Sequence, residues 1–177
     1  LEQGEVSLGG EEREVGVLFV DVIGSTAFTA SHEPTAVVDA LNEFFAVVVD
    51  VTNAHGGLVN KFEGDAALCV WGAPLPHDDP AGAALRAARE LCDRLSASES
   101  RLPAAIGVSA GVAVAGNVGA EDRLEYTVIG DPVNEAARLT ELAKQRSGRV
   151  LATRRAVEAT VDPDEAGRWQ DDGDEVL

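Results

Sequence analysis

The chain has 177 residues, 45% of them hydrophobic, which is enough for one globular domain with a full core. Its 31 acidic and 14 basic side chains give a formal net charge of −17, which repels nucleic-acid backbones and anionic membrane surfaces and argues against either as a direct partner. Cys69 and Cys92 lack metal-type spacing and are expected to be reduced, which fits the cytoplasm.

The first half of the chain predicts a linker, a strand, a helix and a hairpin. Residues 1–13 are charged and show no sustained period, so we expect a linker from an upstream module, followed by one domain over residues 14–177. The apolar run 14–20 predicts a buried strand, and a long helix begins near Pro34. Two short strands, 57–63 and 66–71, are close enough in sequence to form a hairpin.

The second half predicts an alternation of helices and strands. The expected elements are a helix over 81–95, strands over 104–115 and 124–129, a helix capped by Asp131 and running to about 145, and a closing strand-helix-strand segment. Strands and helices therefore interleave in an α/β (α+β) order, and the hairpin makes the sheet mixed rather than all parallel.

Asp21 and Asp65 are the most informative residues, because each interrupts a strongly apolar run where a lone carboxylate is costly to desolvate. If the first strand and the hairpin are neighbours, both carboxylates emerge at one sheet edge and can share one or two Mg²⁺ or Mn²⁺ ions. The alternative for each residue taken singly is a turn aspartate that only caps the backbone.

Three further groups suit a phosphorylated ligand. Gly24, Ser25 and Thr26 form a small-residue turn that leads into a helix and can offer N–H donors to a phosphate. Asn134 and Arg138 are four residues apart and share one helix face, where they form either a solvated pair or a group that stabilises developing charge.

Lys61 lies on the hairpin, where strand alternation places it on one face with Val59 and Glu63, either solvated or contacting a ligand acceptor. Other chemistries find little support. The three histidines do not cluster, no serine has a paired histidine, and no phosphate-binding loop of the Gly-x-x-x-x-Gly-Lys type is present.

Segments 17–26, 60–66 and 126–139 together resemble the catalytic domain of class III nucleotide cyclases, above all adenylyl cyclases, over about residues 15–151. The resemblance implies a ferredoxin-like βαββαβ mixed sheet flanked by helices and a head-to-tail homodimer. It also implies that ATP lies across the dimer interface and is cyclised to cyclic AMP with release of pyrophosphate.

The resemblance also assigns roles to residues. Asp21, Asp65 and the backbone carbonyl of Val22 match the ligands of two divalent cations. Residues Ile23, Gly24, Ser25 and Thr26 match the stretch that holds the distal phosphates. From the other protomer, Lys61 and Thr127 match the purine-reading pair, and Asn134 and Arg138 match the pair that orients the ribose and stabilises the transition state.

Two departures from the family pattern stand out. Thr127 occupies a position that is often Asp, although its hydroxyl can still accept a hydrogen bond from the adenine N6 amine. Lys61 still favours ATP, because guanylyl cyclases typically carry Glu there. The family also places a basic, triphosphate-binding residue after a final strand, and residues 171–177 contain no counterpart, which indicates either a shortened chain or impaired activity.

Two other functions are weighed against an active adenylyl cyclase. A catalytically silent nucleotide-binding or sensory domain is supported only by the missing C-terminal basic residue. A diguanylate cyclase would carry a Gly-Gly-Asp/Glu signature at the hairpin, where this chain has Glu63, Gly64 and Asp65. The leading linker resembles the segment after a signal-relaying helical module, so we expect a fragment of a longer protein that can carry a membrane anchor.

Overall fold

A six-stranded sheet organises the chain in the computed structural model, which describes residues 8–97, 102–120 and 122–173. Five strands follow the order β2-β3-β1-β4-β5, and β6 pairs with β4 outside that path. All pairs are antiparallel except β4 with β6, which is parallel. The strands are β1 (Gly9–Val22), β2 (Leu58–Glu63), β3 (Ala66–Trp71), β4 (Ala104–Ala120), β5 (Arg123–Ile129) and β6 (Val150–Ala152).

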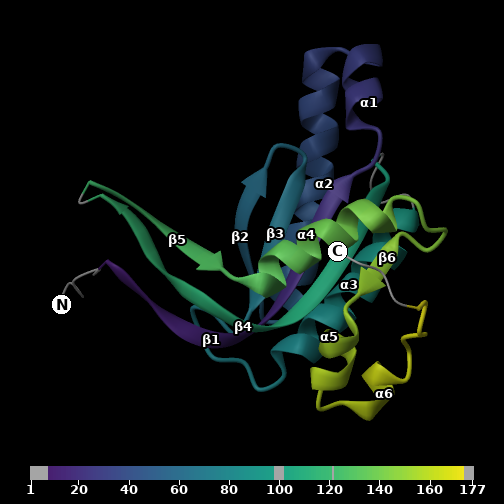
Figure 1. The fold of residues 1–177 in the computed structure, drawn as a ribbon. Helices are drawn as coiled ribbons and strands as arrows, with labels where there is room; N and C mark the ends of the chain where they lie inside the picture. The colour runs from purple at the N-terminus through teal and green to yellow at the C-terminus, as the bar shows by residue number, and fades with distance from the viewer. Residues whose placement is uncertain (1–7, 98–101, 121, 174–177) are drawn as a thin grey trace.

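Helices cover both faces of the central strands (Figure 1). Leu18 and Val20 of β1 pack with α2 and α3 on one face, whereas Val15 and Val17 belong to a second cluster that includes Ala136 of α4. A strand between two helical layers is apolar at successive positions, which explains the unbroken run in β1. The helices are α1 (Ser25–Ser31), α2 (Pro34–Ala54), α3 (Pro80–Ser96), α4 (Asp131–Ala143), α5 (Arg154–Ala159) and α6 (Pro163–Ala166).

The chain order from β1 to β4 is the split βαβ arrangement, in which β1 and β3 are the inner strands. The expected mixed α+β fold, with an open mixed sheet and flanking helices, is therefore confirmed. None of the described helices is both long and apolar enough to cross a membrane.

Two strand boundaries predicted from the sequence, the start of β1 and the end of β4, are wrong. β1 begins at Gly9, so residues 9–13 are not linker but pair with 113–117 of β4, and β4 itself continues to Ala120. The hairpin of β4 and β5 projects from the body of the domain (Figure 1). The pattern of apolar and polar side chains in a sequence indicates burial. It did not reveal this part of β1, because residues 9–13 are paired through the backbone while their side chains are largely exposed. Residues 1–7 lie outside the described residues.

Smaller differences occur at helix ends. The turn after β1 forms a separate short helix, α1, before α2 begins. Gly130 is the N-cap of α4, and Asp131, expected as the cap, is the first helical residue. After β6 the described chain forms α5 and α6, and the expected last strand is not formed within residues 167–173.

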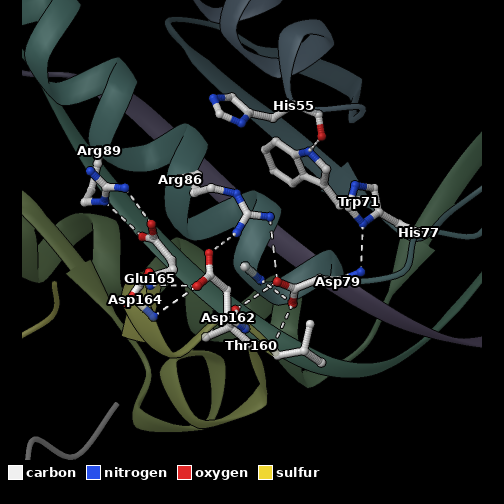
Figure 2. A network of polar contacts seen from close by, with 12 residues as sticks. His55, Trp71, His77, Asp79, Arg86, Arg89, Thr160, Asp162, Asp164 and Glu165 are labelled. Atoms are coloured by element: carbon white, nitrogen blue, oxygen red, sulfur yellow. Dashed lines mark hydrogen bonds and ion pairs between the residues drawn. The ribbon is translucent and has the colours of Figure 1, made fainter. Parts of the chain in front are cut away.

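A polar network ties the C-terminal helices to α3 (Figure 2). Asp79, whose exposure is only 7%, accepts hydrogen bonds from the backbone N–H of Gly82 in α3 and from the hydroxyl of Thr160, which ends α5. Arg86 of α3 adds an ion pair with Asp162, the N-cap of α6. These contacts hold α5 and α6 against α3 at the end of the domain opposite the tip of the β2–β3 hairpin (Figure 1).

Candidate active site

The structure brings Asp21 and Asp65 together at the end of β1. Because β1 and β3 are neighbours, Asp21 is opposite Ala66, the residue after Asp65. The backbone N–H of Val22 donates a hydrogen bond of 3.3 Å to the carbonyl oxygen of Asp65. The positions of the two aspartates therefore agree with the expectation that both emerge at one place in the sheet.

A lysine that the sequence analysis missed lies at this point. The ammonium of Lys144, just beyond α4, is 2.7 Å from Asp21 Oδ2 and 2.7 Å from Glu141 Oε1. Its position six residues after Arg138 carries no familiar pattern. The signal was composition, because a chain this acidic has only two lysines, Lys61 and Lys144.

The Lys144 contact alters the electrostatics of both groups. Burial raises the pKa of Asp21, and the charges of Asp65 and Glu141 add to this, so that the Lys144 ammonium only partly offsets the rise. Burial lowers the pKa of Lys144, but its hydrogen bonds to Asp21 and Glu141 outweigh burial and raise it overall. Asp21 is thus a half-buried carboxylate that already attracts a cation.

The donor set fits a hard divalent cation. Asp65 is close enough to Asp21 for its charge to contribute to the raised pKa of Asp21, and the backbone of Val22 lies beside both residues. The described residues contain no group of three or more His, Cys, Asp or Glu side chains suited to a metal. Two carboxylates are nevertheless the usual protein share of a Mg²⁺ site, in which substrate phosphates and water supply the other oxygens.

The turn after β1 presents backbone donors that have no intrahelical partner, and it lies next to this pair. Gly24 is in the left-handed conformation, with φ of 71°, and precedes α1, whose first intrahelical bond runs from the N–H of Phe28 to Gly24. The N–H groups of Ser25 and Thr26 therefore have no intrahelical partner. The N–H of Ile23 is different, because it donates to the carbonyl of Pro103. A cavity of about 160 Å³ touches both Ser25 and Asp65.

Lys61 lies beside a β-bulge that the sequence did not reveal. The register of β2 against β3 shifts between Val59 and Lys61. Val59 packs against the core that contains α2, and the ring of Phe62 is 4.3 Å from that of Phe45 in α2, so both face the same helix. The expectation that Val59 shares a face with Lys61 is therefore wrong, because the bulge turns Lys61 to the opposite face.

Thr127 lies on β5, at the far end of the strand path from Lys61, but β2 and β5 are nonetheless in contact. Asn134 and Arg138 are both exposed on one face of α4. α4 is held over the sheet by the Thr140 hydroxyl, which donates to the carbonyl of Phe19 over 3.1 Å. Within the described residues, the side chains of Lys61, Asn134 and Arg138 have no hydrogen bond or ion pair.

Residues 10–165 match the sequence pattern of the adenylate and guanylate cyclase catalytic domain. The chain belongs to this family. An uncharacterized protein of Mycobacterium tuberculosis is 54% identical to this cyclase domain over 168 residues, which are 95% of the chain and 31% of that protein. A second from the same organism is 52% identical over 95% of the chain and 30% of its own length. The chain thus spans about a third of the curated relatives it matches.

Solved structures agree with the assignment. A bacterial light-regulated adenylyl cyclase superposes on this cyclase domain with a TM-score of 0.74 at 26% identity, covering 82% of this chain and 78% of the other. The adenylyl cyclase CyaB from P. aeruginosa gives 0.76 at 25% identity, with coverages of 86% and 82%. The guanylyl cyclase Cya2 gives 0.72 at 31% identity, with coverages of 88% and 82%.

These matches place the chain in the class III nucleotide cyclase family, which includes both adenylyl and guanylyl cyclases. Such domains act as dimers with the nucleotide at the interface, and they use divalent cations, generally Mg²⁺ or Mn²⁺. Because both adenylyl and guanylyl cyclases are similar to this domain, the likeness does not distinguish the two purines.

Proposed function

We propose that this domain is an adenylyl cyclase, which converts ATP to 3′,5′-cyclic AMP and pyrophosphate at a homodimer interface with two divalent cations. The observation that carries the proposal is the meeting of Asp21 and Asp65 at the end of β1, where the ammonium of Lys144 already contacts Asp21. A cationic side chain at that carboxylate supports the assignment of the site to cations.

Asp21, Asp65 and the carbonyl of Val22 would hold the metal ions. When bound, two divalent cations make a ribose 3′-hydroxyl more acidic and neutralise charge on the triphosphate. Lys144 would leave Asp21 as a metal ion arrives, since both compete for the same carboxylate oxygens. The N–H groups of Ser25 and Thr26, which have no intrahelical partner, suit the distal phosphates. Ser25 lines the same cavity as Asp65, and Gly24 gives the turn its left-handed bend.

Asn134 and Arg138 would act at the reacting atoms. The 3′-oxygen attacks the α-phosphorus, its proton is lost to solvent, and the bond to the bridging oxygen of pyrophosphate breaks. The guanidinium of Arg138 stabilises the negative charge that develops during this exchange, and the Asn134 amide orients the ribose. Both side chains are exposed and lack partners within the described residues, which leaves them available to a nucleotide bound by a second copy.

Lys61 and Thr127 would select adenine. The ammonium of Lys61 donates to the N1 acceptor of adenine, and the hydroxyl of Thr127 accepts from the N6 amine. Guanine presents an N–H at N1 and an amine at N2, so a lysine there faces donors.

Exposed apolar side chains support a homodimer. Val114 of β4 and its cross-strand partner Ile129 of β5 are 46% and 59% exposed, and Val112 and Val118 lie on the same face of β4 and are also about half exposed. An apolar surface of this kind on a soluble domain marks a contact with another protein. A second copy is the partner that the nucleotide site needs.

Cyclic nucleotide production tests the proposal. ATP and GTP are supplied separately with Mn²⁺ and then Mg²⁺ over a range of protein concentrations. We expect cyclic AMP, with a specific activity that rises with concentration as dimers form. Cyclic GTP as the main product would overturn the purine assignment. Nucleotide binding without any product would instead indicate the catalytically silent module.

A further inference from the structure

Asn60 joins the two ends of the strand path. Its Nδ2 donates a hydrogen bond of 2.8 Å to the carbonyl oxygen of Tyr126. Asn60 belongs to β2 and Tyr126 to β5, which lie at opposite ends of the order β2-β3-β1-β4-β5. Both are outer strands, whose backbone groups lack a strand partner on one side. The side chain of Asn60 therefore makes a cross-link that the sheet ladder does not provide.

The cross-link lies directly beside the candidate purine-reading residues. Lys61 follows Asn60, and Thr127 follows Tyr126. The hydrogen bond between Asn60 and Tyr126 therefore holds the backbones of β2 and β5 at a fixed distance from each other next to Lys61 and Thr127. A purine read at N1 from one strand and at N6 from the other requires that separation to be fixed.

The β-bulge in β2 makes this contact possible. The register shifts between Val59 and Lys61, so Asn60 is the extra residue, and its side chain reaches β5 instead of following the pleat. The same shift turns Lys61 away from α2, as Val59 and Phe62 show by packing on the α2 side. One local irregularity thus sets both the direction of Lys61 and the position of its strand.

The orientation of the amide is determined, because a carbonyl oxygen only accepts and Tyr126 must therefore face the NH₂ group. The remaining Oδ1 atom is buried and has no partner in the part of the chain that the structure describes. An unpaired buried acceptor is unfavourable for folding, whereas a leucine of similar size would avoid that cost. A contribution to stability alone does not account for an asparagine here.

We propose that Asn60 is a positioning residue that sets the distance between Lys61 and Thr127 and thereby the preference for adenine over guanine. The inference rests on the proposed function, since it assigns Asn60 to the same purine site. Asn60 does not touch the purine, and it acts through the two strands that carry the contacting residues.

Two substitutions that nearly preserve the size and shape of the Asn60 side chain test the hydrogen bond. Asn60→Leu removes the donor and the unpaired acceptor, and Asn60→Asp keeps the shape but places an oxygen against the Tyr126 carbonyl. The readout is the ratio of kcat/KM for ATP to kcat/KM for GTP. We expect both variants to lower this ratio roughly three- to tenfold, which corresponds to the loss of one hydrogen bond. Asn53→Leu, at an exposed position of α2, is the control and should keep the wild-type ratio.

A double substitution separates positioning from general damage. If Asn60 acts through Lys61, Asn60→Leu should leave the ratio unchanged in a Lys61→Ala background. Equal losses for ATP and GTP, with an unchanged ratio, would show a purely structural role and overturn the inference. So would a wild-type ratio in Asn60→Asp.

A nucleotide-binding assay distinguishes failure of this inference from failure of the proposed function. If the wild-type domain makes neither cyclic nucleotide, the same variants are compared for binding of fluorescent ATP and GTP analogues. A preference of the wild type for the ATP analogue that Asn60→Leu abolishes supports the positioning role without catalysis. No preference in the wild type, or one that survives the substitution, overturns it.

Discussion

At the residue scale, the contact between Lys144 and Asp21 is the main addition to what the sequence showed. Asp21 is buried enough that its pKa is raised, and it lies beside two other carboxylates, so its ionised form benefits from a nearby cation. Lys144 supplies that cation through a bond that a metal ion must replace. The lysine and the metal therefore compete for one carboxylate.

This competition predicts that Lys144→Met increases affinity for Mn²⁺ in the absence of nucleotide. Removing the ammonium takes away both the ion pair that must break and its repulsion toward the metal. We expect roughly three- to tenfold tighter binding, as for the loss of a partly exposed ion pair. Free Mn²⁺ is measured by electron paramagnetic resonance during titration. Lys61→Met is the matched control, because it removes the only other lysine. Unchanged affinity in Lys144→Met would mean that the pair does not restrict the site.

Arg138 gives a second prediction at this scale. If it stabilises charge that exists only in the transition state, Arg138→Ala should lower kcat by about two to three orders of magnitude and change KM little. Steady-state kinetics with ATP measure both constants. Arg168→Ala, at an exposed position near the C-terminus, is the control. A rise in KM with an unchanged kcat would instead assign Arg138 to ground-state binding.

At the element scale, α6 is anchored to α3 by one nearly buried carboxylate. Glu165, with 2% of its side chain exposed, forms two hydrogen bonds with Arg89, of 2.9 and 2.5 Å, and accepts one of 3.0 Å from the Trp169 indole. Figure 2 shows Glu165 and Arg89 facing each other between the two helices. Burial alone would raise the pKa of Glu165, but these partners outweigh burial and lower it below its usual 4.5.

The lowered pKa predicts a pH-dependent contribution to stability. Because the folded state holds the Glu165 proton less tightly than the unfolded state, its stabilising effect is complete above pH 4.5 and is lost as the pH falls below that value. Glu165→Gln should lower the free energy of unfolding at pH 7 by roughly 2–3 kcal/mol, less than for a fully buried pair because Arg89 is partly exposed.

Urea unfolding of wild type and Glu165→Gln between pH 3.5 and 7 measures this effect. The two curves should converge toward the acid end of the range. Glu158→Gln, at an exposed position of α5, is the control and should follow the wild type throughout. A constant difference between wild type and Glu165→Gln at every pH would contradict the assigned cause.

Elements were predictable where side-chain burial and backbone pairing coincide. β3 is buried at every position, and its sequence bounds, 66–71, agree with the structure. The outer part of β1 is the opposite case, because Gly9 to Arg13 pair with β4 while their side chains are largely exposed. The bulge at Asn60 was not predictable from the sequence either, because an extra residue in a strand is defined only relative to the partner strand.

At the scale of the whole molecule, the candidate site is divided between surfaces of one chain. Asp21 and Asp65 lie at the end of β1, whereas Lys61 and Thr127 lie on the two outer strands and Arg138 is exposed on α4. A head-to-tail dimer would complete two sites, each with carboxylates from one protomer and purine-reading residues from the other.

Complementation between two defective variants tests this arrangement. Asp21→Ala should be inactive alone and Lys61→Ala should keep only weak activity, but their heterodimer should contain one intact site and one doubly defective site. Random mixing gives half heterodimers, so we expect about a quarter of wild-type specific activity. Cyclic AMP is measured after mixing, with heterodimer formation followed by differently tagged chains. No recovery of activity in proven heterodimers would place each site within one chain.

The sequence by itself determined the family and the order of the strands and long helices from β1 to β6, and it predicted the residues of the three candidate groups, because these inferences depend on residue type, spacing and local burial. Only the tertiary structure decided that Asp21 meets Lys144, that a bulge turns Lys61, and that Asn60 reaches Tyr126. These contacts join residues 123 and 66 positions apart. No local pattern encodes such pairs, since sheet order and strand register bring them together only after the whole chain has folded.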